Sequence, residues 1–231
     1  MPFTGALSDL PLTGSYVGGA AADLNFDGTT DLVIVTSDNR LSCYLGLRDG
    51  TFTAPIRTEL TEAAPPVLTS LWRAPRAIPA VLVGRQVLEN HRDCSFTILE
   101  PLSFQVTDAG NVNLDYPQDL LGKVPGSNEF QILMGSLTGP YTLAPQSFSG
   151  IDAKFVDLNN DRYSDLIVRT ATEWQAWINT QGVFSQKSSW SAWGALRVSG
   201  DANGDRIVDL LFEGGNLALG LGNGSFALHP F

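Results

Sequence analysis

The residues best suited to chemistry in this sequence are aspartates and asparagines that recur with one spacing. Three segments follow the pattern Asp-x-Asn-x-Asp-x-x-x-Asp, at residues 23–31, 157–165 and 201–209. Calcium is bound by six to eight hard oxygen atoms, and a short loop can supply several of them from alternate positions. We therefore expect the side chains at positions 1, 3, 5 and 9 of each segment, and the backbone carbonyl at position 7, to bind calcium.

The predicted ligands occupy the same five positions in each intact loop. They are Asp23, Asn25, Asp27, Thr29 and Asp31 in the first loop, Asp157, Asn159, Asp161, Tyr163 and Asp165 in the second, and Asp201, Asn203, Asp205, Ile207 and Asp209 in the third. The alternative is that these residues only form Asx turns at hairpin tips. Three carboxylates in one short loop repel one another without a cation, which favours calcium.

A fourth segment, residues 111–119, keeps the spacing with Asn in place of Asp at position 1. Its predicted ligands are Asn111, Asn113, Asp115, Pro117 (carbonyl) and Asp119. One carboxylate fewer predicts weaker binding. Position 12 of the three intact segments is apolar (Ile34, Val168 and Phe212), whereas an EF-hand has helical flanks and a Glu at that position. The predicted sites are therefore compact loops between strands.

The acidic segments belong to longer repeats. Each intact segment is followed by an apolar run and then by Gly-x-Phe, at 50–52, 182–184 and 224–226. Intact repeats cover about 20–52, 155–184 and 198–226, and degenerate repeats cover about 67–104 and 111–145. The last two acidic segments start 44 residues apart, and the segment at 111 starts 88 residues after the first. These distances predict five repeats of similar length.

Within each repeat, short runs rich in Val, Ile, Leu, Phe and Trp alternate with Gly, Asp, Asn and Pro, and no stretch sustains a helical period. A repeat of this length with about four strands is a propeller blade, because one such sheet must stack on its neighbours to bury both faces. We predict an all-β fold, with residues 1–231 forming one β-propeller domain of five four-stranded blades. The segment at Phe3 resembles the outer strand of a blade and is expected to close the ring on the last blade. A fragment of a larger propeller is the alternative.

Composition narrows the class of partner. The formal net charge is −10, from 24 acidic and 14 basic side chains, and 17 of the acids are Asp. This excess argues against nucleic acid and anionic membrane surfaces, which attract clustered Lys and Arg. No run of 18 apolar residues occurs, so membrane insertion is not expected. Cys43 and Cys94 are expected mainly as buried thiols, with a disulfide as the alternative.

The acidic loops and their flanking strands resemble the FG-GAP repeats of integrin-like β-propellers. In that family the loop joins the first and second strands of a blade, and the resemblance implies the same calcium ligands. Family members often have seven blades, so a count of five is a departure. The family resemblance includes integrin head domains, which bind proteins, and fungal lectins, which bind amino sugars. It implies an extracellular or secreted protein, although the sequence starts without a signal peptide.

Catalysis has little support in the sequence. The two histidines, His91 and His229, lie near no nucleophile or metal-ligand motif. Among the tryptophans, Trp174 and Trp177 are expected on opposite faces of one strand, with Trp177 in the core between blades. Trp190 and Trp193 are expected mainly to pack as outer-strand residues, and stacking on a sugar or anchoring a protein partner is the alternative. Trp72 fills the degenerate loop, where it could cover the end of that blade in place of calcium, and is a further candidate ligand residue.

The predicted function is a non-enzymatic, calcium-stabilised binding module that presents loops to a glycan or a protein. Three calcium ions are expected, with a fourth at the weaker loop. A structural or assembly subunit that uses the propeller as an interaction platform is the alternative. A polysaccharide-active enzyme has less support, because it needs a charged cleft that the sequence does not display.

Overall fold

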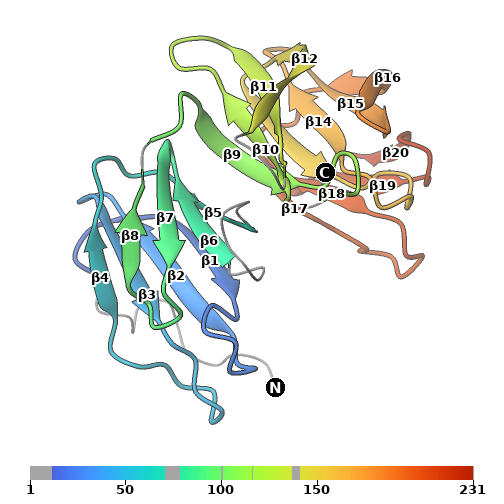
Figure 1. The fold of residues 1–231 in the computed structure, drawn as a ribbon. Helices are drawn as coiled ribbons and strands as arrows, with labels where there is room; N and C mark the ends of the chain where they lie inside the picture. Colours follow the sequence, from blue (N-terminus) through green and yellow to red (C-terminus); the bar gives the residue numbers. More distant parts are fainter. Residues whose placement is uncertain (1–11, 71–78, 100, 116, 137–140, 231) are drawn as a thin grey trace. The chain divides into compact units, whose positions relative to one another are not determined.

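The computed structural model describes residues 12–70, 79–99, 101–115, 117–136 and 141–230 (Figure 1). Its contacts divide the chain into two compact units, residues 1–106 and 107–231, and each unit is described by itself. The predicted N-terminal strand at Phe3 and the predicted role of Trp72 lie outside the described residues. In the ranges given above, no helix has the length and apolar character needed to cross a bilayer.

The first unit contains two four-stranded antiparallel sheets whose strands neighbour one another in chain order. The first sheet consists of β1 (Tyr16–Ala22), β2 (Asp31–Thr36), β3 (Arg40–Tyr44) and β4 (Ile56–Glu59). The second consists of β5 (Pro66–Ser70), β6 (Pro79–Val83), β7 (Gln86–Asn90) and β8 (Phe96–Ile98). The degenerate repeat at 67–104 therefore forms a sheet like the others.

The second unit contains three such sheets (Figure 1). The third sheet is β9 (Gln105–Gly110), β10 (Asp119–Lys123), β11 (Glu129–Met134) and β12 (Thr142–Ser149). The fourth is β13 (Asp152–Val156), β14 (Asp165–Arg169), β15 (Glu173–Thr180) and β16 (Val183–Ser191). The fifth is β17 (Leu196–Gly200), β18 (Asp209–Phe212), β19 (Leu217–Gly220) and β20 (Phe226–His229), with a 3₁₀ turn at Glu213–Gly215.

These sheets confirm the predicted all-β class and the five four-stranded repeats. In the fifth sheet, β20 holds the outer position for which the sequence analysis predicts the N-terminal strand. Each acidic loop joins the first and second strands of its sheet, as the family resemblance implies. Each Gly-x-Phe begins with a glycine of positive φ (Gly50, Gly182 and Gly224) in the connection between the third and fourth strands, where a side chain would be strained.

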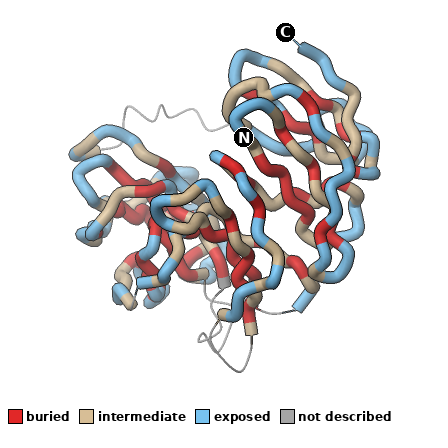
Figure 2. The backbone as a smooth tube through the Cα atoms, turned by 90° about the horizontal axis from the view of Figure 1, so that it is seen from above, coloured by how far each residue is buried: buried red, intermediate tan, exposed pale blue. Residues whose placement is uncertain are grey.

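The core lies between successive sheets of each unit. In the fourth sheet, Leu166 and Val168 face a cluster shared with the third sheet, whereas Ile167 between them faces a cluster shared with the fifth. All three residues are fully buried. The buried residues follow the strands in Figure 2, and the connecting loops are mostly exposed. A sheet that is apolar on both faces requires neighbours on both sides, which is the stacking logic of propeller blades.

Cys43 and Cys94 form a disulfide, with a Cα–Cα distance of 5.5 Å. Cys43 lies on β3 and Cys94 follows β7, so the bond ties the first sheet to the second within one buried cluster. The preferred prediction of two buried thiols is therefore wrong. Both sulfur atoms are buried as expected, but the packing of the two sheets brings them together, and sequence spacing alone does not reveal that packing.

The two tryptophans of β15 lie on opposite faces of the fourth sheet, as predicted. The Trp177 ring packs edge-on against Phe148 of the third sheet, with 5.4 Å between ring centroids. Trp174 packs against Phe212 of the fifth sheet at 5.3 Å. Trp177 therefore belongs to the core between two sheets.

Candidate calcium loops and surface hollows

The acidic loops share one backbone conformation. Position 4 has a positive φ in all four loops, at Phe26, Leu114, Asn160 and Gly204. Position 6 also has a positive φ in the three intact loops, at Gly28, Arg162 and Arg206. Left-handed residues are uncommon outside glycine and asparagine, so their recurrence at two fixed positions is a property of the motif. The turns they create bring the side chains of positions 1, 3 and 5 together.

The side chains at positions 1 and 5 accept hydrogen bonds from the loop's own backbone. In the first loop, the Asp23 carboxylate accepts the N–H groups of Asp27 (3.2 Å) and Gly28 (2.9 Å). The Asp27 carboxylate accepts the N–H of Thr29 at 2.8 Å. The other two intact loops repeat these bonds. The Asx-turn network proposed as the alternative is therefore present, and it shapes the loop that any cation would enter.

The asparagine at position 3 links the two parts of this network. Asn25 Nδ2 donates to Asp27 Oδ2 at 2.8 Å, and Asn25 Oδ1 accepts the Asp27 N–H at 3.0 Å. The equivalent asparagines in the other three loops make the same pair of contacts. The oxygen atoms of positions 1, 3 and 5 therefore converge on one turn of backbone.

The aspartate at position 9 has a second role that the sequence analysis missed. Asp31, Asp119, Asp165 and Asp209 are each at most 1% exposed. Each accepts two backbone N–H groups at 2.7–2.8 Å, one from position 2 of its own loop and one from the end of the third strand or the two residues after it. This carboxylate therefore fastens the loop to the sheet. The partners near the third strand, Gly46, Gly135, Asn179 and Gly220, lie 11 to 16 residues after the aspartate, so no fixed spacing in the sequence marked them.

Burial raises the pKa of two of these carboxylates. Loss of hydration raises the pKa of Asp165 to about 6; hydrogen bonds from Asn179 and Leu158 oppose the rise, and the carboxylates of Asp161 and Asp157 add to it. Burial likewise raises the pKa of Asp119. Both shifts show that the charged form is penalised where negative charges gather, which a nearby cation would relieve.

The donor set of the loops suits calcium. Each intact loop offers three carboxylates, one amide oxygen and one backbone carbonyl, which are the hard oxygen ligands of this ion. In the fourth loop, Asn111 Oδ1 is buried and has no hydrogen-bond partner, so it is free to bind a cation. Across the part of the chain that the structure describes, no three His, Cys, Asp or Glu side chains form a ready-made metal cluster. The position 9 carboxylates already bind backbone N–H groups, so a calcium ion would share their oxygen atoms.

The tryptophans proposed as ligand residues lie mostly in the core. Trp190 is 7% exposed and packs against Phe226 at 4.9 Å and Phe212 at 6.1 Å. Trp193 is half-buried and packs against Phe212 at 5.8 Å. The structure therefore supports the preferred prediction of packing for Trp190, because the outer strand β16 places this ring against the fifth sheet.

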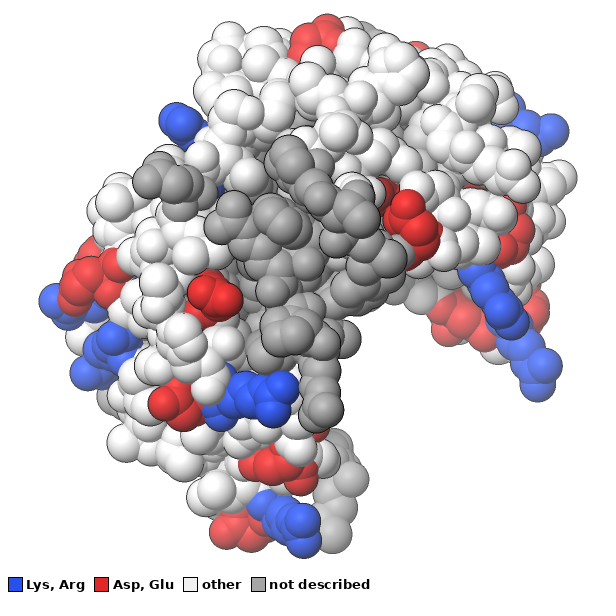
Figure 3. All heavy atoms as spheres, viewed as in Figure 1, with Lys and Arg blue, Asp and Glu red and all other residues white. Residues whose placement is uncertain are grey.

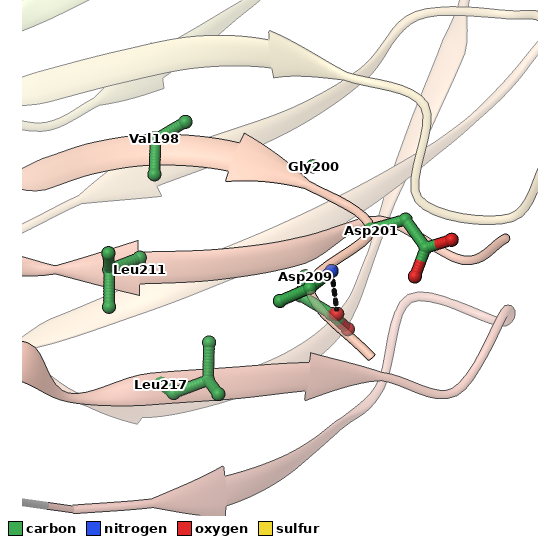
Figure 4. A pocket seen from close by; sticks show the side chains of 7 residues that line it. Val198, Gly200, Asp201, Asp209, Leu211 and Leu217 are labelled. Atoms are coloured by element: carbon green, nitrogen blue, oxygen red, sulfur yellow. Dashed lines mark hydrogen bonds between the residues drawn. The ribbon is translucent and has the colours of Figure 1, made fainter. Parts of the chain in front are cut away.

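The fifth sheet carries an apolar hollow of about 370 Å³. In Figure 4, Val198, Leu211 and Leu217 lie side by side on β17, β18 and β19, and the carboxylates of Asp201 and Asp209 lie at one end of these strands. Val198 is 55% exposed and Leu211 is 37% exposed. The hollow is thus an uncovered stretch of sheet face rather than an enclosed pocket.

The first unit has a more polar hollow of about 300 Å³ beside the first acidic loop. It is lined by Thr29, Thr30, Gly46, Leu47, Arg48, Gly50, Thr51 and Phe52. Thr29 is position 7 of the acidic loop, and its hydroxyl donates to the carbonyl of Gly46 at 3.0 Å. Hydroxyl groups, a guanidinium and an aromatic ring therefore meet next to a predicted calcium ligand.

Basic side chains do not dominate the visible surface. On the face drawn in Figure 3, Lys and Arg lie among Asp and Glu, with large neutral areas between them. This distribution agrees with the formal net charge of −10.

Comparison with solved structures supports the fold. Over 94% of this chain, the structure is similar to a lectin from Agrocybe aegerita described as specifically recognising non-reducing terminal N-acetylglucosamine, with a TM-score of 0.63 and 17% identity. The chain spans 66% of that lectin. It is also similar to AofleA from Arthrobotrys oligospora (TM-score 0.52, 9% identity, 87% of this chain and 68% of that one). A third similar structure is BBS1N in complex with ARL6DN (TM-score 0.51, 13% identity, 94% of this chain and 83% of that one).

Comparison by sequence identifies no family. No protein-family model matches the chain, and no curated protein is significantly similar to it. At these low identities the structural likeness concerns the fold, and the FG-GAP resemblance rests on the acidic loops themselves.

Proposed function

We propose that this protein is a non-enzymatic, glycan-binding β-propeller whose acidic loops hold calcium. The observation that carries the proposal is the match of five four-stranded sheets, over 94% of the chain, to a lectin fold. The likeness in fold supports a binding role, and the glycan ligand is inferred from the chemistry of the surface described above.

We place the sugar in the hollow lined by Thr29, Arg48, Thr51 and Phe52. Sugar hydroxyls need hydrogen-bond donors and acceptors, and the apolar face of the ring needs an apolar or aromatic surface. The Arg48 guanidinium supplies donors, and the threonine hydroxyls supply acceptors. Phe52 supplies the ring. This combination suits a neutral or amino sugar better than the apolar hollow on the fifth sheet does.

Calcium would support this site indirectly. Thr29 lines the hollow and also offers its carbonyl as the position 7 ligand of the first loop. A cation held by Asp23, Asn25 and Asp27 would fix this wall of the hollow. We therefore propose that glycan binding depends on calcium even though the sugar itself does not contact the ion.

The disulfide supports the predicted extracellular location. Disulfides persist in oxidising compartments and are rare in the reducing cytosol. Cys43 and Cys94 are both bonded and fully buried. We propose that the protein works outside the cell or in another oxidising compartment.

Glycan binding is tested by screening the purified protein on a glycan array, with calcium and with EGTA. Wild type should bind terminal sugars in calcium and lose binding in EGTA. Arg48→Ala should weaken binding about 10-fold, the effect of losing hydrogen bonds from a charged donor. Arg57→Ala is the matched control, because Arg57 is an exposed arginine of the same sheet that does not line the hollow. A blank array under both conditions would reject the lectin proposal.

An assembly subunit is the second candidate, and the apolar hollow on the fifth sheet favours it. Val198 and Leu211 expose apolar surface to solvent, which is a usual mark of protein contact. A blank glycan array, together with a stable protein complex that Leu211→Asp disrupts, would favour this function over glycan binding.

A further inference from the structure

One position near the end of the third strand alternates between glycine and asparagine along the chain. The five residues are Gly46, Asn90, Gly135, Asn179 and Gly220. Glycine is required in the odd-numbered sheets, because a Cβ at Gly46 would lie 2.2 Å from the carbonyl oxygen of Thr30, and one at Gly220 would lie 2.3 Å from that of Val208. The even-numbered sheets instead carry a buried amide, which calls for a separate explanation.

Each of these asparagines reaches the acidic loop of the preceding sheet. Asn90 Nδ2 donates to the carbonyl of Leu24 at 2.8 Å, from the second sheet to the first. Asn179 Nδ2 donates to the carbonyl of Val112 at 2.7 Å, from the fourth sheet to the third. Leu24 and Val112 both occupy position 2 of an acidic loop. Two independent pairs of sheets therefore make the same contact.

The two amides are buried and satisfied. Asn90 is 4% exposed and Asn179 is fully buried. Asn90 Oδ1 accepts the N–H of Arg92 at 2.8 Å, and Asn179 Oδ1 accepts that of Gly182 at 2.7 Å. Burying an amide is unfavourable unless its groups are paired, so the side chain has one orientation, with Nδ2 directed at the loop.

With this contact, both backbone groups of the position 2 residue are hydrogen-bonded. The Leu24 N–H donates to the buried Asp31 carboxylate at 2.8 Å, while its carbonyl accepts the Asn90 amide. Position 2 lies between the predicted ligands at positions 1 and 3. Holding it on both sides therefore sets the direction in which Asp23 and Asn25 leave the backbone.

We propose that Asn90 and Asn179 are positioning residues for the calcium sites at 23–31 and 111–119, each acting from the sheet that follows. This inference rests on the proposed calcium binding. The loop at 157–165 is different, because the next sheet has Gly220 at this position and offers no side chain to the Leu158 carbonyl. One chain therefore contains acidic loops that accept this asparagine hydrogen bond from the next sheet and a loop that does not.

The test compares Asn90→Leu with Gln86→Leu by calcium titration calorimetry. Gln86 is the matched control: it is 3% exposed, starts the strand that Asn90 ends, and bonds to Thr61 and Glu62 rather than to the loop. Asn90→Leu should weaken one calcium site by about 10-fold or more, the usual effect of losing an outer-shell partner. Gln86→Leu should leave every site unchanged. Asn90→Ser, which is too short to reach Leu24, replaces Asn90→Leu if that variant does not fold.

A second readout does not depend on calcium. In EGTA, hydrogen exchange of the Leu24 amide should be faster in the Asn90 variant than in wild type or Gln86→Leu, because its loop has lost one anchor. Wild type that binds calcium, with an Asn90 variant of equal affinity, would overturn the positioning role alone. Wild type that binds no calcium would instead reject the proposed function on which this role rests.

Discussion

At the scale of single residues, the acidic loops divide their carboxylates between two tasks. The aspartates at positions 1 and 5, which are half-buried or exposed, shape the tip of the loop and are the accessible oxygen donors. The buried aspartate at position 9 binds two backbone N–H groups, one in the loop and one at the third strand. Removing a carboxylate therefore has a different effect at each position.

The fifth sheet allows these tasks to be separated. Asp209→Ala leaves the N–H groups of Ala202 and Gly220 without their partner, so we expect it to lower the free energy of unfolding by about 2–4 kcal/mol in EGTA, and by more in calcium because Asp209 is also a predicted ligand. Asp205→Asn keeps the side-chain shape and an acceptor for Ile207. It should change stability little in EGTA but reduce the stabilisation that calcium provides. Urea unfolding of both variants in each condition makes the comparison.

An equal loss of stability for the two variants in EGTA would contradict this division.

The sequence predicted where these aspartates lie but not all that they do. Spacing identified the four acidic loops, and the family resemblance implied that each of them joins the first and second strands of its sheet. The anchoring role of position 9 depends on a partner N–H at or just after the end of the third strand, such as that of Gly46 or Gly220. That partner becomes visible only when the strands are aligned.

At the scale of strands and sheets, the acidic loop and the third strand approach so closely that one position near the end of that strand requires glycine. In the fifth sheet, Gly220→Ala would place a Cβ 2.3 Å from the carbonyl oxygen of Val208. We expect it to lower the free energy of unfolding by about 1–3 kcal/mol, the cost of overpacking. Gly200→Ala in the same sheet meets no atom within 4 Å and should change stability by less than about 0.5 kcal/mol. Thermal unfolding of the two variants measures the difference, and equal stability would show that the loop can move aside.

The disulfide is the covalent link between the first two sheets. Its two cysteines are 51 residues apart in the sequence. A double Cys43→Ala, Cys94→Ala variant should lose about 2–4 kcal/mol of stability, mainly because the unfolded chain is no longer constrained. Unfolding by urea under reducing and non-reducing conditions checks this expectation. A wild type and a double variant of equal stability, without reductant, would contradict it.

Contacts between neighbouring sheets are the features of this scale that the sequence did not predict. Period and turn residues were enough to define five repeats, since each repeat forms its sheet from neighbouring strands. The disulfide and the Asn90 contact join residues of different repeats, and nothing in one repeat indicates them. For Trp190, the sequence favoured packing of the outer strand, but it did not identify the partner, which is Phe212 of the next sheet.

At the scale of the whole molecule, the acidity is chiefly a property of the loops. Eleven of the 17 aspartates lie in the four acidic segments. Three bound calcium ions would change the formal net charge from −10 to −4. Under the proposed calcium binding, the negative charge is a set of metal ligands rather than a field that attracts basic partners.

Stability of the whole protein should follow calcium. An ion that binds the folded state and not the unfolded chain stabilises the fold by mass action. We expect EGTA to lower the melting temperature by several degrees and added calcium to restore it. Magnesium at the same concentration is the control, because it accepts the loose geometry of such loops less readily.

The most direct test of the account is a count of bound calcium ions, by native mass spectrometry and calorimetric titration of wild-type protein. We predict three ions, at the loops 23–31, 157–165 and 201–209, and a fourth, weaker one at 111–119. Asp27→Asn, Asp161→Asn and Asp205→Asn should each weaken one of the three tight sites. A protein that binds no calcium in either measurement, and whose melting temperature is the same in calcium and in EGTA, would contradict the central claim.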